Sequence, residues 1–141
     1  MAMVAAGIAN GGVLMKPHVG AEIRDSNGDL VRRIATGEWR TAISPGTAQA
    51  VAAMMVSVVE SPQGTGTAAR IPGVTVAGKT GTAQADGGPP HAWFIGFAPA
   101  EAPQYAVAVL VERGGSVGSE ATGGRVAAPI AARLLRAALG I

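Results

Sequence analysis

The sequence contains no cysteine and few aromatic or charged residues. Among 141 residues, aromatic side chains make up 4% and charged side chains 14%, with a formal net charge of +2. The absence of cysteine excludes disulfides, thiol nucleophiles and thiolate metal sites, and it suits an oxidising compartment. A basic surface interleaved with aromatic rings is also missing, so we expect no nucleic-acid partner.

Long hydrophobic runs are absent as well, although the composition is apolar. The longest apolar stretches, residues 50–59 and 105–111, fall far short of the roughly 20 residues of a membrane-spanning helix. Hydrophobic residues nevertheless make up 48% of the chain. This content excludes a disordered polypeptide and is sufficient for the core of one domain.

Capping and turn signals divide the chain into helices and strands. Ser44 followed by Pro45 is typical of a helix start, and Asn27-Gly28 predicts a tight hairpin. The predicted helices cover residues 1–9, 44–60 and 125–139. The predicted strands cover residues 19–24, 30–34, 74–84, 92–98 and 104–112. The last three strands have short connections, which permit only antiparallel neighbours.

Two of the predicted helices have apolar residues at helical spacing. In the helix that begins at Ser44 these residues are Val51, Met54, Met55, Val58 and Val59. In the last helix they are Ile130, Ala131, Leu134 and Ala138. Each set predicts the helix face that is buried.

The densest polar segment is Lys79-Thr80-Gly81-Thr82. Residues 73–80 satisfy the pattern of a phosphate-binding loop, but that loop needs a helix directly after its Lys-Thr pair. The Gly-Thr-Ala-Gln that follows, and the Gly-Gly-Pro-Pro turn after it, cannot begin a helix that would hold a phosphate. We therefore interpret the segment as a strand.

In a strand, a period of two places Thr80, Thr82 and Gln84 on one face and Lys79 and Gly81 on the other. Neighbouring hydroxyls with a lysine at the rim suit a carboxylate ligand, whereas the alternative is an ordinary solvated edge strand. Gly81 indicates that another element approaches the backbone closely. The preceding loop adds three candidates for a substrate or regulatory contact: Thr65, Thr67 and Arg70.

The two histidines, His18 and His91, are isolated from other metal-ligand residue types. A metal site needs several such side chains together, so we expect no metal. For His91, which precedes the aromatic strand, we expect a structural role.

Four segments in this order resemble the transpeptidase domain of penicillin-binding proteins, especially class B enzymes of the actinobacterial type. They are Ile-Ala-Asn-Gly-Gly at 8–12, Lys-Thr-Gly-Thr at 79–82, Ala-Trp-Phe-Ile-Gly-Phe-Ala-Pro at 92–99 and Ala-Ala-Pro-Ile-Ala at 127–131. The resemblance covers nearly the whole chain. It implies an α+β, β-lactamase/transpeptidase-like fold, in which an antiparallel sheet is flanked by helices, and no metal or organic cofactor.

The resemblance also implies roles for the strand residues. Lys79 would polarise the site, and the hydroxyls of Thr80 and Thr82 would bind the carboxylate of a D-alanyl-D-alanine stem peptide or of a β-lactam. The backbone N–H of Thr82 would be half of an oxyanion hole. The ligand would lie along residues 77–84 as an added strand, so that Gly81 and Gln84 also belong to the binding edge.

The nucleophile of this family is missing. No serine is followed three residues later by lysine, and none is followed two residues later by asparagine, so the Ser-x-x-Lys and Ser-x-Asn motifs are absent. We expect residues 1–141 to be the C-terminal portion of a transpeptidase domain, inactive alone and completed by an upstream segment that carries the serine. The resemblance further implies an N-terminal membrane anchor outside this chain and a catalytic domain on the extracytoplasmic face of the bacterial membrane.

The expected reaction of the complete domain is peptidoglycan cross-linking through a serine acyl-enzyme. A D,D-carboxypeptidase, a serine β-lactamase and a non-catalytic penicillin-binding sensor remain alternatives, because Lys-Thr-Gly encodes neither the acyl acceptor nor the rate of deacylation. The Trp-Phe and Ala-Ala-Pro segments favour the transpeptidase.

Overall fold

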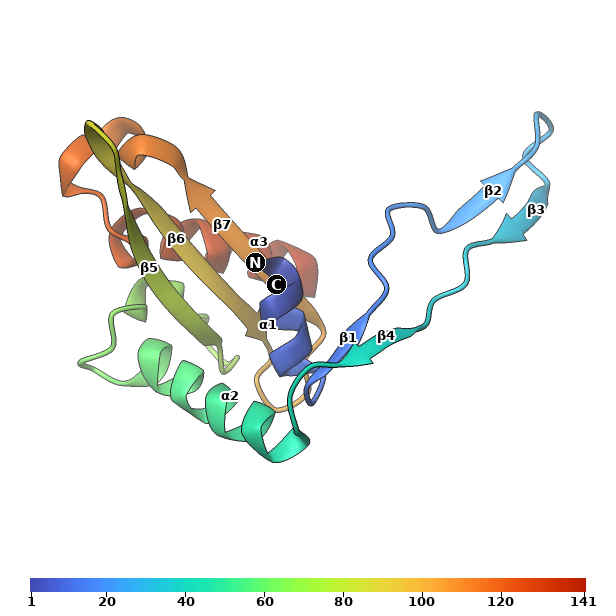
Figure 1. The fold of residues 1–141 in the computed structure, drawn as a ribbon, viewed down its shortest axis with the longest axis horizontal. Coiled ribbons are helices and arrows are strands. Elements are labelled where there is room, and N and C mark those ends of the chain that lie inside the picture. Colours follow the sequence, from blue (N-terminus) through green and yellow to red (C-terminus); the bar gives the residue numbers. More distant parts are fainter.

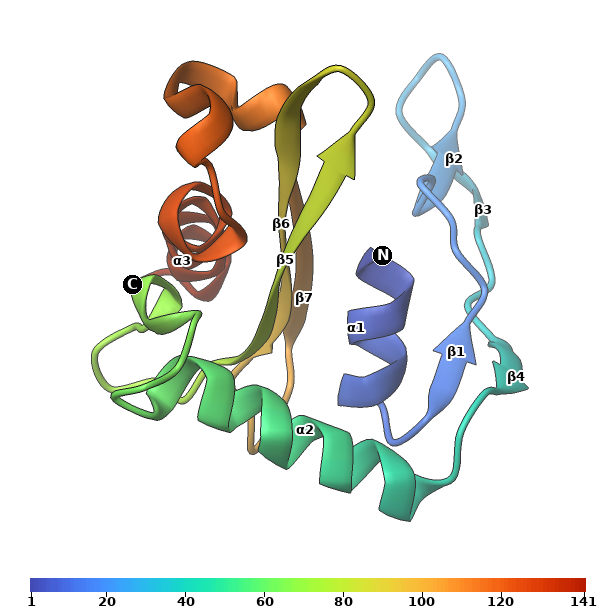
Figure 2. The same cartoon turned by 60° about the vertical axis from the view of Figure 1, so that its left-hand side comes forward.

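A three-stranded antiparallel sheet lies between helices, and a long hairpin projects from this body (Figure 1). The computed structural model describes all 141 residues. The sheet has the order β5 (Ala77–Ala85), β6 (Gly88–Ala98), β7 (Tyr105–Val111). Helix α3 (Ala128–Leu139) covers one face, while α1 (Ala2–Ala9) lies on the other and α2 (Pro45–Glu60) runs past the end of β5 (Figure 2). The predicted α+β class is confirmed.

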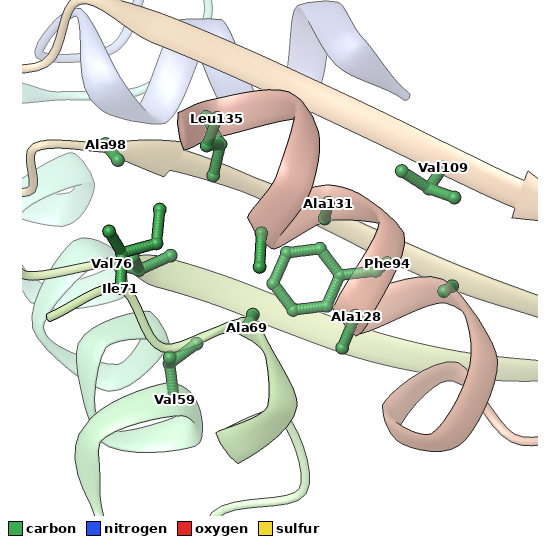
Figure 3. Packing of buried hydrophobic residues seen from close by; sticks show 12 residues of the cluster. Val59, Ala69, Ile71, Val76, Phe94, Ala98, Val109, Ala128, Ala131 and Leu135 are labelled. Atoms are coloured by element: carbon green, nitrogen blue, oxygen red, sulfur yellow. The ribbon is translucent and has the colours of Figure 1, made fainter. Parts of the chain in front are cut away.

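The second half of the central strand β6, Phe94–Ala98, is buried on both of its faces. Phe94 is fully buried in the larger apolar cluster under α3, where it points toward Ala128 and Ala131 (Figure 3). Phe97 is fully buried in a second cluster on the opposite face, with Met55 of α2. Burial on both sides explains why Phe94–Ala98 is continuously apolar instead of alternating with polar residues.

The C-terminal end of α2 is tied to the start of β5. The Arg70 guanidinium donates from Nε to the carbonyl of Val59 at 2.9 Å and from Nη2 to that of Glu60 at 2.8 Å. The Glu60 carboxylate accepts the backbone N–H of Val76 at 3.0 Å. These hydrogen bonds pair two carbonyls at the end of α2 and one N–H before β5. Helix and sheet hydrogen bonds would leave these groups without a partner.

The predicted bounds of the first two helices agree with the structure, whereas the last helix, predicted from residue 125, begins at Ala128 and follows a π-helical segment, Gly123–Ala127. The Ser44 hydroxyl accepts the N–H of Thr47 at 3.2 Å, and Pro45 occupies the first turn of α2. Pro129 is the second residue of α3, which continues directly from the π-helical segment Gly123–Ala127. Two shorter helical segments complete the chain, η1 (Thr67–Ala69) and the π-helical η3 (Gly123–Ala127), together with η2 (Glu112–Glu120), whose turns are interrupted by residues of positive φ such as Arg113 and Gly114.

The predicted buried faces of α2 and α3 are partly wrong. Helix α3 buries Ala128, Ala131, Ala132 and Leu135, whereas Ile130 and Leu134 are 40% and 49% exposed. Helix α2 buries Ala48, Met55 and Val59, while Met54 is 65% exposed. The large side chain of Phe94 already fills the space between sheet and helix, so the alanine side of α3 packs there.

The projecting hairpin has two separate ladders. Strand β1 (Val13–Met15) pairs with β4 (Glu38–Thr41), and β2 (Glu22–Arg24) pairs with β3 (Leu30–Arg33). The predicted turn at Gly28 is confirmed, with φ at 87°. Strand β2 begins three residues later than predicted, and the β1–β4 ladder was not predicted, because such short strands carry too few residues to show a period.

Replacing Phe94 with alanine tests the main core. Because Phe94 is fully buried and contacts both strand and helix, Phe94→Ala should lower the free energy of unfolding by about 3–5 kcal/mol. Urea unfolding followed by circular dichroism measures this change. Val31→Ala on the exposed hairpin is the control and should shift it by at most about 0.5 kcal/mol. A loss of under about 1 kcal/mol for Phe94→Ala would contradict this packing.

Candidate functional site at the free edge of β5

Strand β5 forms one edge of the sheet and pairs only with β6. Its register is regular from Ala77 opposite Phe97 to Ala83 opposite His91. The predicted alternation therefore holds, with Thr80 and Thr82 on one face and Lys79 and Gly81 on the other. The outer side of β5 is left with backbone groups that no strand pairs, which is the arrangement that an extended peptide can join.

The Thr80 hydroxyl is held from the preceding loop. Its Oγ1 lies 2.7 Å from Oγ1 of Thr65, a hydrogen-bonding distance in which either hydroxyl can donate. Of the three loop candidates, only Thr65 thus reaches the strand through its side chain. Thr67 begins η1, and the Arg70 guanidinium is engaged at the end of α2.

The close approach predicted at Gly81 is confirmed, and the approaching element is the start of η3. A Cβ atom on Gly123 would lie 2.7 Å from the carbonyl oxygen of Gly81 and would overlap the carbonyl oxygen of Trp93. The next residue, Gly124, is equally close to the loop, since a Cβ atom there would overlap the carbonyl oxygen of Thr65. This glycine pair was not singled out from the sequence, although two adjacent glycines before a helix are a signal of close packing.

The remaining predicted site residues line the open edge. The side chains of Lys79, Thr82 and Gln84 are exposed, and Lys79 Nζ donates to the carbonyl of Thr80 at 2.5 Å. Gln84 lies opposite a register irregularity, where Pro89 and Pro90 of β6 interrupt the ladder. The edge therefore presents one ammonium group and two hydroxyls to solvent, a donor set suited to an anion.

No cavity encloses this edge in the chain as it stands. A cavity of about 700 Å³ lies elsewhere, between α2 and residues 70–75, with Glu60 and Arg70 in its wall. The site is thus an open strand rather than a pocket.

His91 accepts the backbone N–H of Arg113 through Nδ1 at 3.2 Å, which agrees with its expected structural role.

Three further observations concern groups that the chain does not contain. Its serines lack the Ser-x-x-Lys and Ser-x-Asn contexts, so the edge faces no activated nucleophile of this type. No group of three or more His, Asp or Glu side chains is placed to hold a metal ion. None of the helices combines the length and apolarity needed to cross a membrane.

Curated relatives extend well beyond the length of this chain. It is 43% identical to peptidoglycan D,D-transpeptidase PbpA of Mycobacterium tuberculosis (strain ATCC 25618 / H37Rv) over 142 residues, covering 98% of this chain and 28% of that protein. The protein of the same name from Mycolicibacterium smegmatis is 42% identical over 142 residues, with the same 98% and 28% coverage. The chain thus spans less than a third of these relatives.

Solved structures of penicillin-binding protein A from M. tuberculosis have the same fold. The ceftriaxone acyl-enzyme complex has a TM-score of 0.90 at 42% identity, covering 98% of this chain and 31% of that one. The penicillin G acyl-enzyme complex has a TM-score of 0.84 at 41% identity, with 98% and 31% coverage. The family model described as penicillin binding protein transpeptidase domain matches residues 1–136, nearly the whole chain. These matches confirm the resemblance inferred from the four sequence segments, and the chain belongs to the penicillin-binding protein transpeptidase domain family.

Proposed function

We propose that this chain supplies the carboxylate-binding strand of a serine D,D-transpeptidase that cross-links peptidoglycan. The observation that carries the proposal is the free edge of β5, which presents Lys79, Thr80 and Thr82 together and lacks an attacking group. The chain is then the C-terminal portion of the catalytic domain and is inactive without the segment that carries the serine.

The peptide that donates the acyl group lies along β5 as an added strand. Its main chain pairs with the free backbone groups of residues 77–84, and its terminal carboxylate accepts hydrogen bonds from the hydroxyls of Thr80 and Thr82. The ammonium group of Lys79 favours the same negative charge. A stem peptide ending in D-alanyl-D-alanine and a β-lactam share this carboxylate, so both fit the edge.

The covalent steps need a serine hydroxyl from the upstream segment. Its oxygen attacks the carbonyl carbon of the penultimate D-alanine, and the backbone N–H of Thr82 stabilises the oxyanion. The peptide C–N bond breaks, the leaving D-alanine takes up a proton, and a serine ester remains. An amine of a second stem peptide then attacks this ester and releases the serine. With penicillin, the ring amide opens and the whole drug stays on the serine.

The upstream segment has a place to pack on the sheet. Trp93 and Leu110 are cross-strand partners on the same face as Gly81, and Leu110 is 40% exposed while Trp93 is only half-buried. An apolar helix on this part of the face would bury both side chains and bring its serine beside β5.

Peptidoglycan lies outside the membrane, so the site works on the extracytoplasmic face, with the membrane anchor in a segment other than these residues.

Intact-mass spectrometry of the native protein that contains this chain tests the proposal. Incubation with penicillin G should add the mass of one penicillin to a polypeptide with a Ser-x-x-Lys segment. Residues 1–141 alone should gain nothing. An adduct that water removes within seconds would indicate a β-lactamase instead. The absence of any adduct on the complete protein would rule out acyl transfer.

Lys79→Ala should slow acylation of the complete domain strongly. Loss of the ammonium group removes a fixed positive charge beside the developing anion, so the second-order rate constant with penicillin G should fall by about a hundredfold or more. Lys16→Ala is a matched control, because Lys16 is the only other lysine among residues 1–141 and lies at the base of the hairpin. Equal rate constants for Lys79→Ala and the wild type would remove Lys79 from the site.

Thr82→Val should weaken acylation less than Lys79→Ala. Valine keeps the β-branched shape and the backbone N–H and removes only one hydroxyl that donates to the carboxylate. The same rate constant should fall by about tenfold, the value of one hydrogen bond to a charged group. Thr41→Val, at an exposed position of β4, should leave it unchanged. A Thr82→Val enzyme as fast as the wild type would show that the carboxylate lies elsewhere.

A further inference from the structure

We propose that Thr65 is a positioning residue, which orients the Thr80 hydroxyl so that its proton points toward the ligand carboxylate. This inference rests on the proposed function, because it assigns a task to a residue outside the strand that receives the ligand. The structural basis is the 2.7 Å contact between Oγ1 of Thr65 and Oγ1 of Thr80.

The number of protons that each hydroxyl can donate decides which threonine is the donor when the ligand is bound. A threonine hydroxyl has one proton to donate, and an ionised carboxylate can only accept. If the Thr80 hydroxyl donates to the ligand, it cannot also donate to Thr65, so Thr65 must donate to Thr80. The chain of donors then runs from Thr65 through Thr80 to the carboxylate, and each bond polarises the next.

The backbone around Thr65 is held from two sides. The N–H of Gly66 donates to the carbonyl of Val58 at 2.9 Å, which ties the loop to the last turn of α2. On the other side, Gly124 packs so closely on the Thr65 carbonyl that no Cβ atom fits between them. The backbone at Thr65 is therefore held in place. The Thr65 hydroxyl contacts Thr80 from this fixed position, so no mobile loop has to become ordered first.

A purely structural role would be a bond that holds the loop against β5 and does nothing for the ligand. The two roles differ in one measurable respect. A donor chain that ends on the carboxylate matters only to ligands that have this carboxylate. Loss of a structural bond instead affects every ligand and the stability of the protein alike.

The test uses the complete transpeptidase domain that contains this chain, with penicillin G and its methyl ester as probes. Thr65→Val should lower the acylation rate constant for penicillin G by about threefold to tenfold, the value of one hydrogen bond. The rate constant for the ester should change by less than twofold. Thr65→Ser, which keeps the hydroxyl, should restore the wild-type value for penicillin G. Thr67→Val is the matched control, since it alters the same loop at a side chain that makes no hydrogen bond in the structure.

A double-mutant cycle with Thr80→Val supplies an independent measurement. If Thr65 acts through Thr80, Thr65→Val should have no further effect once the Thr80 hydroxyl is gone. Should Thr65→Val fail to fold, Thr65→Ala takes its place in both experiments. Equal losses for penicillin G and the ester, or an additive double mutant, would overturn the positioning role while leaving the proposed function intact. If the wild-type domain is not acylated at all, the proposed function fails and the positioning role fails with it.

Discussion

The proposed binding edge depends on a contact of backbone against backbone that leaves no space for a side chain. Gly123 lies so close to Gly81 and Trp93 that a Cβ atom would overlap the main chain, and Gly124 lies equally close to Thr65. The sheet at Gly81 and Trp93, the loop at Thr65 and the start of η3 are distant in the sequence. The glycine contacts fix the distances between them. Since interiors yield little to added volume, this contact sets the position of β5 relative to the loop and the last helix.

The core maintains the same arrangement from within the sheet. Phe94 occupies the space above Gly78, where a Cβ atom would overlap its ring, and the alanine face of α3 closes over the ring. Close packing of a large side chain against small ones brings the start of α3 near the sheet. Gly123 and Gly124 begin η3, which continues directly into this helix, so the packing that stabilises the fold also holds the two glycines against β5.

Local features of this fold could be predicted from the sequence, and features that depend on distant partners could not. Ser44 and Pro45 identify the start of α2, and the period of two in β5 separates Thr80 from Lys79, because both signals act over a few residues. The helix face of α3 was misassigned, since an alanine-rich helix has more than one apolar stripe and only the shape of the sheet selects among them. Gly81 predicted a close approach, but nothing near it indicates that Gly123 is the partner. The role proposed for Thr65 could not be predicted either, because it depends on the contact of its hydroxyl with the side chain of Thr80.

In the proposed function, the carboxylate-binding strand and the attacking serine lie on separate segments of the chain. Hydroxyls on a strand that is fixed by glycine contacts need little reorganisation when a carboxylate arrives, so the anion meets donors that already point to the edge. An activated serine requires different surroundings, with a neighbouring lysine and partial burial, which an open strand edge cannot provide. A transpeptidase therefore gains from placing the carboxylate-binding strand and the nucleophile on separate segments of the fold. The exposed face around Trp93 and Leu110 is where we propose that the two segments meet, and burial of that face would link completion of the core to completion of the site.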